Sequence, residues 1–490
     1  MAPRITPELD ALFDALLGSE KQRIFDHIGE KLPHTFRFNP LKGDVAVQRD
    51  FFLEQGFRFH PMDGRDDIFI IDEQPYPIGK SLSHFMGHIY VQDIASMIPP
   101  LVLDPQPGDW VLDMSAAPGS KTTQMGAMMA NRGVILANDV VLKRLKALSK
   151  NVERMSMCNT LINRWFGEQY GNVYFEQFDR VLLDPACSGL GTLHKNPEIL
   201  DWWTPKHCER LAGSQKNQLI SAVKALRPGG VLVYSTCTLT PEENEANVQF
   251  VLDEFPMEIE PIAVAGLTSW PGLTEFGGRR FHPDMDRTIR LYPMDRVTEG
   301  FFVARLRKTA SSGAPHPGKR KEPRQTSYLT HKTSPVKKYV DNLVEQFDIK
   351  EKVFKPFLFT MNGERIAFLS REFDEFPIFG KPLQLGTVMA RALDRSTRLN
   401  SGGTHLLGPH ARRNVIDLPD LATLETFANH EPLSIEVEKP GQHIVRYRGM
   451  TIGYGIVEKG VFKSQFPKGE WPFQLTGGWE SPASPSDVSD

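Results

Sequence analysis

Residues 110–121 read WVLDMSAAPGSK, and residues 133–139 read GVILAND. Each stretch begins as a short apolar strand and ends in small or polar residues, and a helical pattern separates the two. The same order recurs further along the chain in TLIN at 160–163, FDRVLLDP at 178–185, GGVLVYST at 229–236 and GFFVARL at 300–306. Strands that alternate with helices over residues 105–308 predict βαβ units, and therefore an α/β fold with a doubly wound, Rossmann-like parallel sheet.

The chain on either side of this segment differs in composition. Residues 1–104 combine a predicted helix, Pro7 to Lys31, with extended stretches, and predict a small α+β region. Residues 309–335 are rich in Pro, Ser, Lys and Arg, and predict a basic flexible linker that either meets a partner or is a plain solvated spacer. Residues 336–475 predict a compact β-rich domain with glycine turns, and residues 476–490 a disordered tail.

Length and composition indicate a globular protein of about three domains, since 490 residues include 40% hydrophobic and 24% charged side chains. The formal net charge of −3 argues against a uniformly basic chain that coats nucleic acid. No apolar run approaches the roughly 18 residues that a membrane span needs, and the first residues lack the parts of a signal peptide. We therefore expect a cytoplasmic protein with no membrane partner.

The four cysteines are Cys158, Cys187, Cys208 and Cys237. They form no CxxC pair and have no matching histidine cluster, so neither a disulfide framework nor a metal site is predicted. Cys158 and Cys208 fit the pattern of small core residues. Cys187 and Cys237 instead follow predicted strands directly, among Gly, Ser and Thr, which favours a catalytic role for this pair.

A ligand-binding turn is predicted at Ser115–Lys121, because small residues and Gly119 let the backbone approach a ligand where a helix offers free N–H groups. A P-loop is excluded, since Met114 stands in the place of its first glycine, and the dinucleotide fingerprint GxGxxG is absent. Asp139 ends the next strand, where an acid either binds ribose hydroxyls or merely caps a helix. Loop and acid together fit S-adenosylmethionine.

Two later strands deliver thiols to the carboxyl edge of the sheet, where open α/β sheets bind their ligands. LLDPACSG carries Asp184 and Cys187, and VYSTCTLTPEENE carries Cys237. The 50 residues between the two thiols equal about one helix with its connections. We therefore expect both thiols in one cleft.

A thiol pair of this kind suits methylation at C5 of a pyrimidine. That carbon attacks a sulfonium methyl group only after a thiolate has added to C6. A carboxyl group such as that of Asp184, near N3 and the exocyclic amine, favours the protonated adduct. An exocyclic-amine methyltransferase needs no thiol and would show a [DN]PP[YF] motif, whereas this chain reads DPAC.

At these residues the sequence resembles the Nol/Nop/Sun family of RNA cytosine-C5 methyltransferases. The likeness covers roughly Gln92 to Lys308 and rests on YVQDIASMIPP, DMSAAPGSKT, AND, LLDPACSG, RPGGVLVYSTCTLTPEENE and GFFVARLRK. Three positions depart from the family pattern: Ala186 replaces the Pro before the first cysteine, Phe166 replaces an Asp, and Met294 stands where relatives often have His.

The resemblance implies a class I S-adenosylmethionine-dependent methyltransferase with Cys237 as nucleophile and Cys187 as the thiol that releases the product. Asp184 would contact both cofactor and target base. The residues that would hold S-adenosylmethionine are Ser115, Ala116, Ala117, Pro118, Gly119, Ser120, Lys121, Asp139, Arg144 and Asp184.

The resemblance also implies RNA-binding regions outside the catalytic segment. Residues 336–475 would form a PUA-like RNA-binding domain, and residues 1–104 would contact RNA, with Arg37 and Asn39 matching that region's R-x-N signature. The expected substrate is 16S ribosomal RNA, free or in the small (30S) subunit, and the expected state is a monomer. A base must be unstacked to react, which favours looped or partly assembled RNA.

Three alternatives remain open at this point. The substrate is tRNA in the first. In the second the thiol roles are reversed, with Cys187 as the nucleophile. In the third the chain is a catalytically weak, RNA-binding ribosome-assembly factor.

Overall fold

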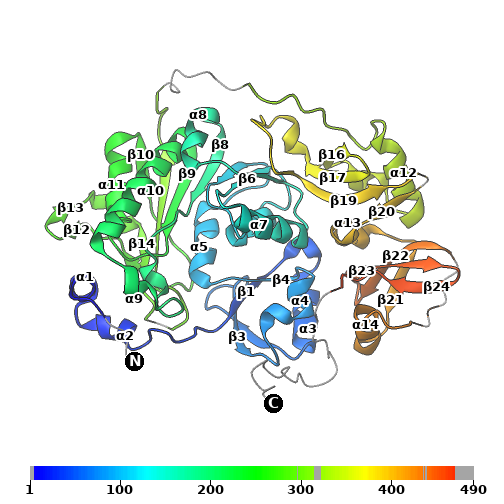
Figure 1. Cartoon of the computed structure of the whole chain (residues 1–490), viewed down its shortest axis with the longest axis horizontal. Helices are drawn as coiled ribbons and strands as arrows, with labels where there is room; N and C mark the ends of the chain where they lie inside the picture. The colour runs from blue at the N-terminus through cyan, green and yellow to red at the C-terminus, as the bar shows by residue number, and fades with distance from the viewer. Residues whose placement is uncertain are drawn as a thin grey trace, which may run out of the picture.

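A computed structural model of the chain describes residues 5–294, 296–313, 322–394, 396–433, 435 and 439–468. The middle of the predicted linker, 314–321, and the predicted tail, 476–490, lie outside these residues. Figure 1 shows a large central sheet, with the N-terminal region below it and two smaller sheets of the C-terminal third at the right. No helix of the described chain is long and apolar enough to cross a membrane.

The central sheet has ten strands, in the order β11-β14-β15-β9-β8-β5-β6-β7-β18, with β10 paired to β15. Its parallel strands are β5 Trp110–Asp113, β6 Val134–Asn138, β7 Thr160–Asn163, β8 Phe178–Leu183 and β9 Leu226–Thr236. From β5 the chain winds first toward β7 and then, in the other direction, toward β9. The predicted α/β fold with a doubly wound sheet is confirmed.

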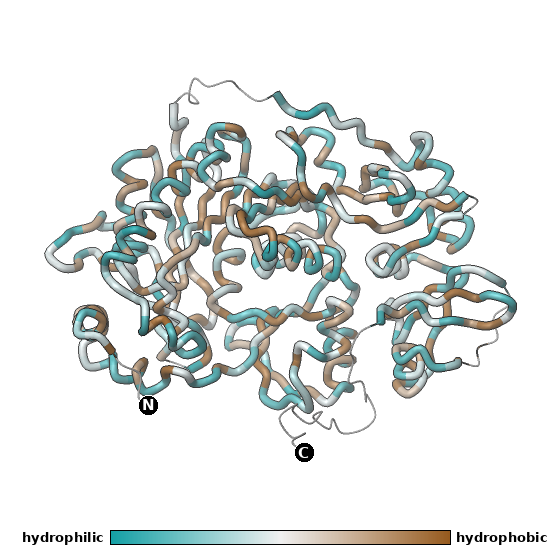
Figure 2. Tube along the Cα trace, viewed as in Figure 1, coloured by the Kyte–Doolittle hydropathy of each residue, from teal (hydrophilic) through white to brown (hydrophobic). Residues whose placement is uncertain are grey.

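Helices cover both faces of this sheet. Val111 packs in one core with α5 Ile94–Leu103, α6 Ser120–Met128 and α7 Leu142–Arg154. Its neighbour Leu112 packs in the other core with α8 Tyr170–Val173, α10 Pro205–Ala225 and α11 Glu245–Glu254. Successive strand residues point to opposite faces, so a strand buried on both sides is apolar throughout. Figure 2 shows these apolar stretches in brown.

The parallel sheet predicted over residues 105–308 has an antiparallel edge, and β18 adds an antiparallel strand at the opposite edge. β15 Phe301–Lys308, which contains most of GFFVARL, pairs antiparallel with β9 and with β14 Ile289–Leu291. The antiparallel strands β10 Met257–Glu260 and β11 Trp270–Pro271 extend this edge. Residues 292–300 are too few for the crossover that a parallel pair needs, so β14 and β15 run antiparallel.

The N-terminal region is an α+β unit with a phenylalanine-rich core. Its elements are β1 Thr35–Phe38, α3 Val45–Glu54, β2 Arg58–Pro61, β3 Phe69–Glu73, α4 Leu82–Phe85 and β4 Ile89–Val91. The single helix expected over Pro7 to Lys31 is instead α1 Pro7–Leu17, a 3₁₀ turn and α2 Lys21–Phe25. Gly18 ends α1 with φ of +53°, a conformation that glycine adopts without strain.

The C-terminal third holds two sheets, each with its own core. The first comprises α12 Val336–Phe347, β16 Phe357–Asn362, β17 Arg365–Ser370, β19 Thr387–Ala392, β20 Thr397–Leu399 and α13 Ser401–Leu407. The second comprises β21 Val415–Leu418, α14 Leu421–Ala428, β22 Gly441–Tyr447, β23 Met450–Glu458 and β24 Val461–Ser464. β18 Gln384–Leu385 pairs with β7, so this third is joined to the central sheet.

Part of the segment predicted as a linker makes specific contacts. The Arg324 N–H donates to the Ile378 carbonyl at 2.6 Å, and Leu329 forms a bridge with Phe359 of β16. Residues 322–335 therefore run along the first C-terminal sheet.

Candidate active site

The turn at Ser115–Gly119 connects β5 to α6 and lies beside the end of β6, where the Ala116 N–H donates to the Asn138 carbonyl at 2.7 Å. Gly119 has φ of +112°, a conformation that favours glycine, and a Cβ at this position would lie 3.0 Å from Leu148 Cδ1, a tight contact. The backbone of the turn thus passes close to α7.

Three side chains hold this turn by donating hydrogen bonds to backbone carbonyls of the turn and of the residue that follows it. Arg144 Nη2 donates to the Ala117 carbonyl, and Asn151 Nδ2 donates to the Pro118 carbonyl at 2.9 Å. Arg37, from β1, donates to the Ser120 carbonyl at 3.2 Å. Arg37 and Asn39 are both buried, so in this structure the R-x-N residues pack inside the protein.

Asp139 follows β6 with only 3% of its surface exposed. Its Oδ1 accepts a hydrogen bond from the Val141 N–H at 2.9 Å, a local turn contact just before α7. Its Oδ2 lies 3.2 Å from Arg144 Nη1 but accepts no hydrogen bond from a described residue. A buried carboxylate oxygen that accepts no hydrogen bond fits a ribose hydroxyl, so Asp139 suits S-adenosylmethionine.

Apolar surface lies next to this carboxylate. Val140 is 44% exposed and Phe166, which follows β7, is 67% exposed. The ends of β6 and β7 are paired through Asn138 and Asn163, which places the two following segments side by side. Exposed apolar side chains beside a ribose site suit an adenine ring, and this fits the predicted cofactor.

The two thiols meet at the carboxyl edge of the sheet. Cys187 follows β8 and Cys237 follows β9, and because these strands are parallel neighbours, their Sγ atoms lie 3.1 Å apart. The Gly191 N–H donates to the Cys237 carbonyl at 2.9 Å, and the hydroxyls of Ser188 and Thr238 lie 2.6 Å apart. The loops that carry the thiols are thus joined at several points.

Asp184 lies beside the thiols and is held by two donors. Lys121 Nζ lies 2.6 Å from its Oδ2, and Ser235 Oγ donates to its Oδ1 at 3.1 Å. Burial disfavours the charged form of Lys121, but the nearby Asp184 carboxylate outweighs it and raises the pKa of the lysine. The cofactor turn and the reactive edge therefore meet in one ion pair.

The Cys187 thiol is held in its protonated form. The hydrogen bond to Cys237 and burial raise the pKa of the Cys187 thiol well above its ordinary value, and the negative charges of Glu243 and Asp184 act in the same direction. Cys187 therefore keeps an S–H group 3.1 Å from the Cys237 sulfur.

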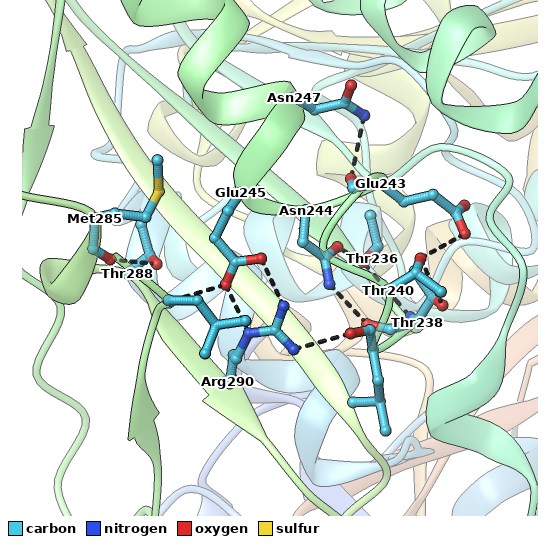
Figure 3. Close-up of polar contacts among 12 residues, drawn as sticks. Thr236, Thr238, Thr240, Glu243, Asn244, Glu245, Asn247, Met285, Thr288 and Arg290 are labelled. Carbon is cyan, nitrogen blue, oxygen red and sulfur yellow. Dashed lines mark hydrogen bonds and ion pairs between the residues drawn. The ribbon is translucent and has the colours of Figure 1, made fainter. Parts of the chain in front are cut away.

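A buried carboxylate, Glu243, clamps the two thiol loops together. Its Oε2 accepts the Ser188 N–H at 3.0 Å and Gln215 Nε2 at 2.8 Å, and its Oε1 accepts the Thr240 hydroxyl at 2.8 Å. Figure 3 shows Glu243 beside Thr240 and Thr238. Glu243 was not among the site residues predicted from the sequence. The available signal was the acidic run PEENE, which begins shortly after the second thiol.

A fully buried ion pair contacts the loop that carries Cys237. Arg290 Nε and Nη2 lie 2.6 and 2.5 Å from the two carboxylate oxygens of Glu245. The same guanidinium donates from Nη1 to the Leu239 carbonyl at 2.9 Å, two residues after Cys237 (Figure 3). A planar, bidentate pair of this kind fixes orientation as well as distance.

The other two cysteines are core residues, as predicted. Cys158 and Cys208 are buried, and burial raises the pKa of each thiol to about 12. No group of three His, Cys, Asp or Glu side chains among the described residues is arranged to hold a metal ion.

Fold and site together define a class I methyltransferase with paired thiols at its reactive edge. A family model described as 16S rRNA methyltransferase RsmB/F matches residues 100–307. The ribosomal RNA small subunit methyltransferase F of Vibrio vulnificus (strain YJ016) is 31% identical over 447 residues, covering 90% of this chain and 91% of that protein.

Two proteins from Pyrococcus species match a smaller share of the chain. The tRNA (cytosine(49)-C(5))-methyltransferase of Pyrococcus abyssi is 37% identical over 290 residues, covering 59% of this chain and 92% of its own length. The crystal structure of a methyltransferase homolog protein from Pyrococcus horikoshii is 35% identical, with a TM-score of 0.57, covering 62% of this chain and 95% of that chain.

The chain therefore belongs to the RsmB/F (Nol/Nop/Sun) family of RNA cytosine-C5 methyltransferases, and the resemblance seen in the sequence is confirmed. S-adenosylmethionine is its cofactor, as predicted.

Proposed function

We propose that this enzyme transfers a methyl group to C5 of a cytosine in small-subunit ribosomal RNA through a covalent adduct between Cys237 and C6. The observation that carries this proposal is the pair of Sγ atoms 3.1 Å apart at the sheet edge, beside the Asp184 carboxylate. Methylation of an exocyclic amine has no use for such a pair.

The reaction begins when the Cys237 thiolate adds to C6 and makes C5 nucleophilic. Asp184, oriented by Lys121 and Ser235, binds the N3 and amine edge of the cytosine and stabilises the adduct. S-adenosylmethionine, when bound, supplies the methyl group that C5 attacks. Loss of the C5 proton to solvent then restores the C5–C6 double bond and expels Cys237 as a thiolate.

Cys187 acts in the last step. Its pKa is raised by the hydrogen bond to Cys237 and by burial, so it carries a proton when the adduct breaks down. An S–H group 3.1 Å away stabilises the departing Cys237 thiolate. This supports Cys237 as the nucleophile and Cys187 as the releasing thiol.

The extent of the similarity supports ribosomal RNA as the substrate. The relative named for the small ribosomal subunit matches 90% of this chain, including most of the C-terminal third. The relative named for tRNA matches 59% of this chain although it is matched over 92% of its own length, so a large part of this chain has no counterpart there. We propose that the two C-terminal sheets serve the larger substrate and include the predicted PUA-like domain.

The proposal is tested by incubating Cys187→Ala and Cys237→Ala variants with cofactor and small-subunit ribosomal RNA. We expect Cys187→Ala to accumulate a covalent protein–RNA complex that survives denaturing electrophoresis. Cys237→Ala should form no complex and transfer no methyl group. Cys158→Ala, a buried thiol in the core of the first C-terminal sheet, is the matched control and should release its product normally.

Two outcomes would contradict the proposal. A complex formed by Cys237→Ala but not by Cys187→Ala would reverse the thiol roles. Methyl transfer by the wild type to tRNA transcripts and not to ribosomal RNA would assign the other substrate, and transfer to neither would favour the assembly-factor alternative.

A further inference from the structure

A second concave site lies where α7 meets the N-terminal region and both C-terminal sheets (Figure 1). It is a cavity of about 470 Å³, within the range of cavities that hold small ligands. The cavity is lined by residues from α4, α7, α13, β23 and the segment after β24. Its charged and aromatic lining residues are Lys42, Phe85, Lys150, Glu153, Arg154 and Phe466. None of these residues belongs to the thiol site.

Three cations line this cavity without a counter-ion. Lys42 is buried, with 5% of its surface exposed, and Lys150 is exposed. Arg154 donates to neutral groups, among them the His84 carbonyl and Asn151 Oδ1. Among the described residues no carboxylate forms an ion pair with Lys42, Lys150 or Arg154.

One acid, Glu153, lines the same cavity and leaves the cations in excess. Partial burial of its carboxyl group raises the pKa of Glu153, and the cation that acts against this is Arg365 of β17. Burial lowers the pKa of Lys42, and the charge of Arg154 lowers it further. A buried cation without a partner is costly, and an anion that enters the cavity would offset this cost.

Two phenylalanines also line the cavity. Phe85 is half-buried, whereas Phe466 is buried with 2% of its surface exposed and packs against the Phe85 ring, with the two centroids 5.3 Å apart. Cations next to aromatic rings are the side chains with which proteins bind single-stranded nucleic acid, the cations at the phosphate and the ring at the base. The three cations and the accessible part of the Phe85 ring together suit one nucleotide.

We infer that this cavity binds one nucleotide of the RNA substrate, with its phosphate at Lys42, Lys150 and Arg154 and its base against Phe85. The inference rests on the proposed function in taking the ligand from RNA, and a free mononucleotide is the other source of the same chemistry. Ten residues of α7 separate Arg154 from Arg144 at the cofactor turn, which is roughly 15 Å. One RNA chain can therefore reach both sites.

The test measures the affinity of the full chain for a fluorescent RNA hairpin from the small subunit, without cofactor, as salt is raised. We expect Lys150→Glu to weaken binding roughly tenfold and to lower the slope of log K against log salt by roughly 0.7 to 0.9, as for one lost phosphate contact. Lys146→Glu is the matched control, because it makes the same charge change on α7 outside the cavity. It should change affinity less than about twofold with an unchanged slope.

A second variant tests the Phe85 ring. Phe85→Ala should weaken RNA binding roughly tenfold without lowering the salt slope, since a base contact carries no counterion release. Unfolding midpoints of all variants are compared with the wild type, and the half-buried Phe85 is judged against Phe85→Leu, which keeps the packing but not the ring. Cytidine monophosphate should compete with RNA only at much higher concentration.

Equal losses for Lys150→Glu and Lys146→Glu, or an unchanged salt slope for Lys150→Glu, would overturn the inference. Effects of Lys150→Glu on cytidine monophosphate binding alone would assign the cavity to a free nucleotide. Because binding is measured without methyl transfer, an RNA that needs Lys150 but is not methylated would contradict the proposed function and leave this site standing. Normal methylation together with an RNA affinity that Lys150→Glu does not change would overturn this inference and leave the proposed function standing.

Discussion

The thiol site and the cavity beside α7 treat buried charge in opposite ways. At the thiol site each cation has a carboxylate, as Lys121 has Asp184 and Arg290 has Glu245. In the cavity Lys42 and Arg154 face neutral groups or other cations. Paired charges hold the thiol loops in place before any substrate arrives, whereas unpaired charges gain stabilisation only when an anion binds. The difference separates a site built for chemistry from one built for binding.

The largest expected effect comes from breaking a pair on the thiol side. Arg290→Met leaves the fully buried Glu245 without a counter-ion and should lower the free energy of unfolding by roughly 3–5 kcal/mol, measured by urea denaturation. Arg290→Met combined with Glu245→Leu should recover much of this loss. A loss of less than about 1 kcal/mol, as expected for the exposed pair of Arg287 and Asp284, would mean that the buried pair does not support the Cys237 loop.

The next effect concerns the rate. Asp184→Asn removes the charge that orients Lys121 and, in the proposed reaction, binds the cytosine edge, so kcat should fall roughly 10²- to 10³-fold. Single-turnover methyl transfer to the RNA substrate measures this. The same change at Asp201, an exposed residue of α9 Ile199–Trp202, is the control and should leave kcat within about twofold. A fall only in RNA affinity would remove Asp184 from the chemical step.

The smallest expected effect is a pH dependence of stability caused by His88, a buried histidine near Lys42. Burial lowers the pKa of His88 from 6.5 to about 3, and the charge of Lys42 acts in the same direction, so the folded protein keeps this ring neutral. Between pH 6.5 and 3 the unfolded chain binds a proton at His88 that the folded protein does not, so stability falls as the pH is lowered. From pH 7 to pH 5 this amounts to roughly 2 kcal/mol of unfolding free energy.

His88→Gln should remove this part of the loss of unfolding free energy between pH 7 and pH 5, measured by urea denaturation at both pH values. The control is His60→Gln, since the His60 side chain is 53% exposed and has Asp72 as a partner. An unchanged pH dependence in His88→Gln would show that this buried ring is not where acid acts.

The parallel strands could be predicted from the sequence because each is a continuous apolar run followed by small or polar residues. The predicted strand TLIN is β7 to the residue, and WVLDM contains β5. The antiparallel edge was missed, since an apolar run such as GFFVARL reads the same in either direction and only the length of its connection decides the pairing.

Sequence by itself determined which residues come to the reactive edge. A residue that directly follows a parallel strand must lie at the carboxyl edge of the sheet, so Asp184, Cys187 and Cys237 were placed by local pattern alone. Only the tertiary structure decided the 3.1 Å between the thiols, the clamp made by Glu243 and the cations gathered beside α7. Those features join segments as distant as Lys42 and Phe466, and no local pattern records which distant side chains share one cavity or which charges are left without partners.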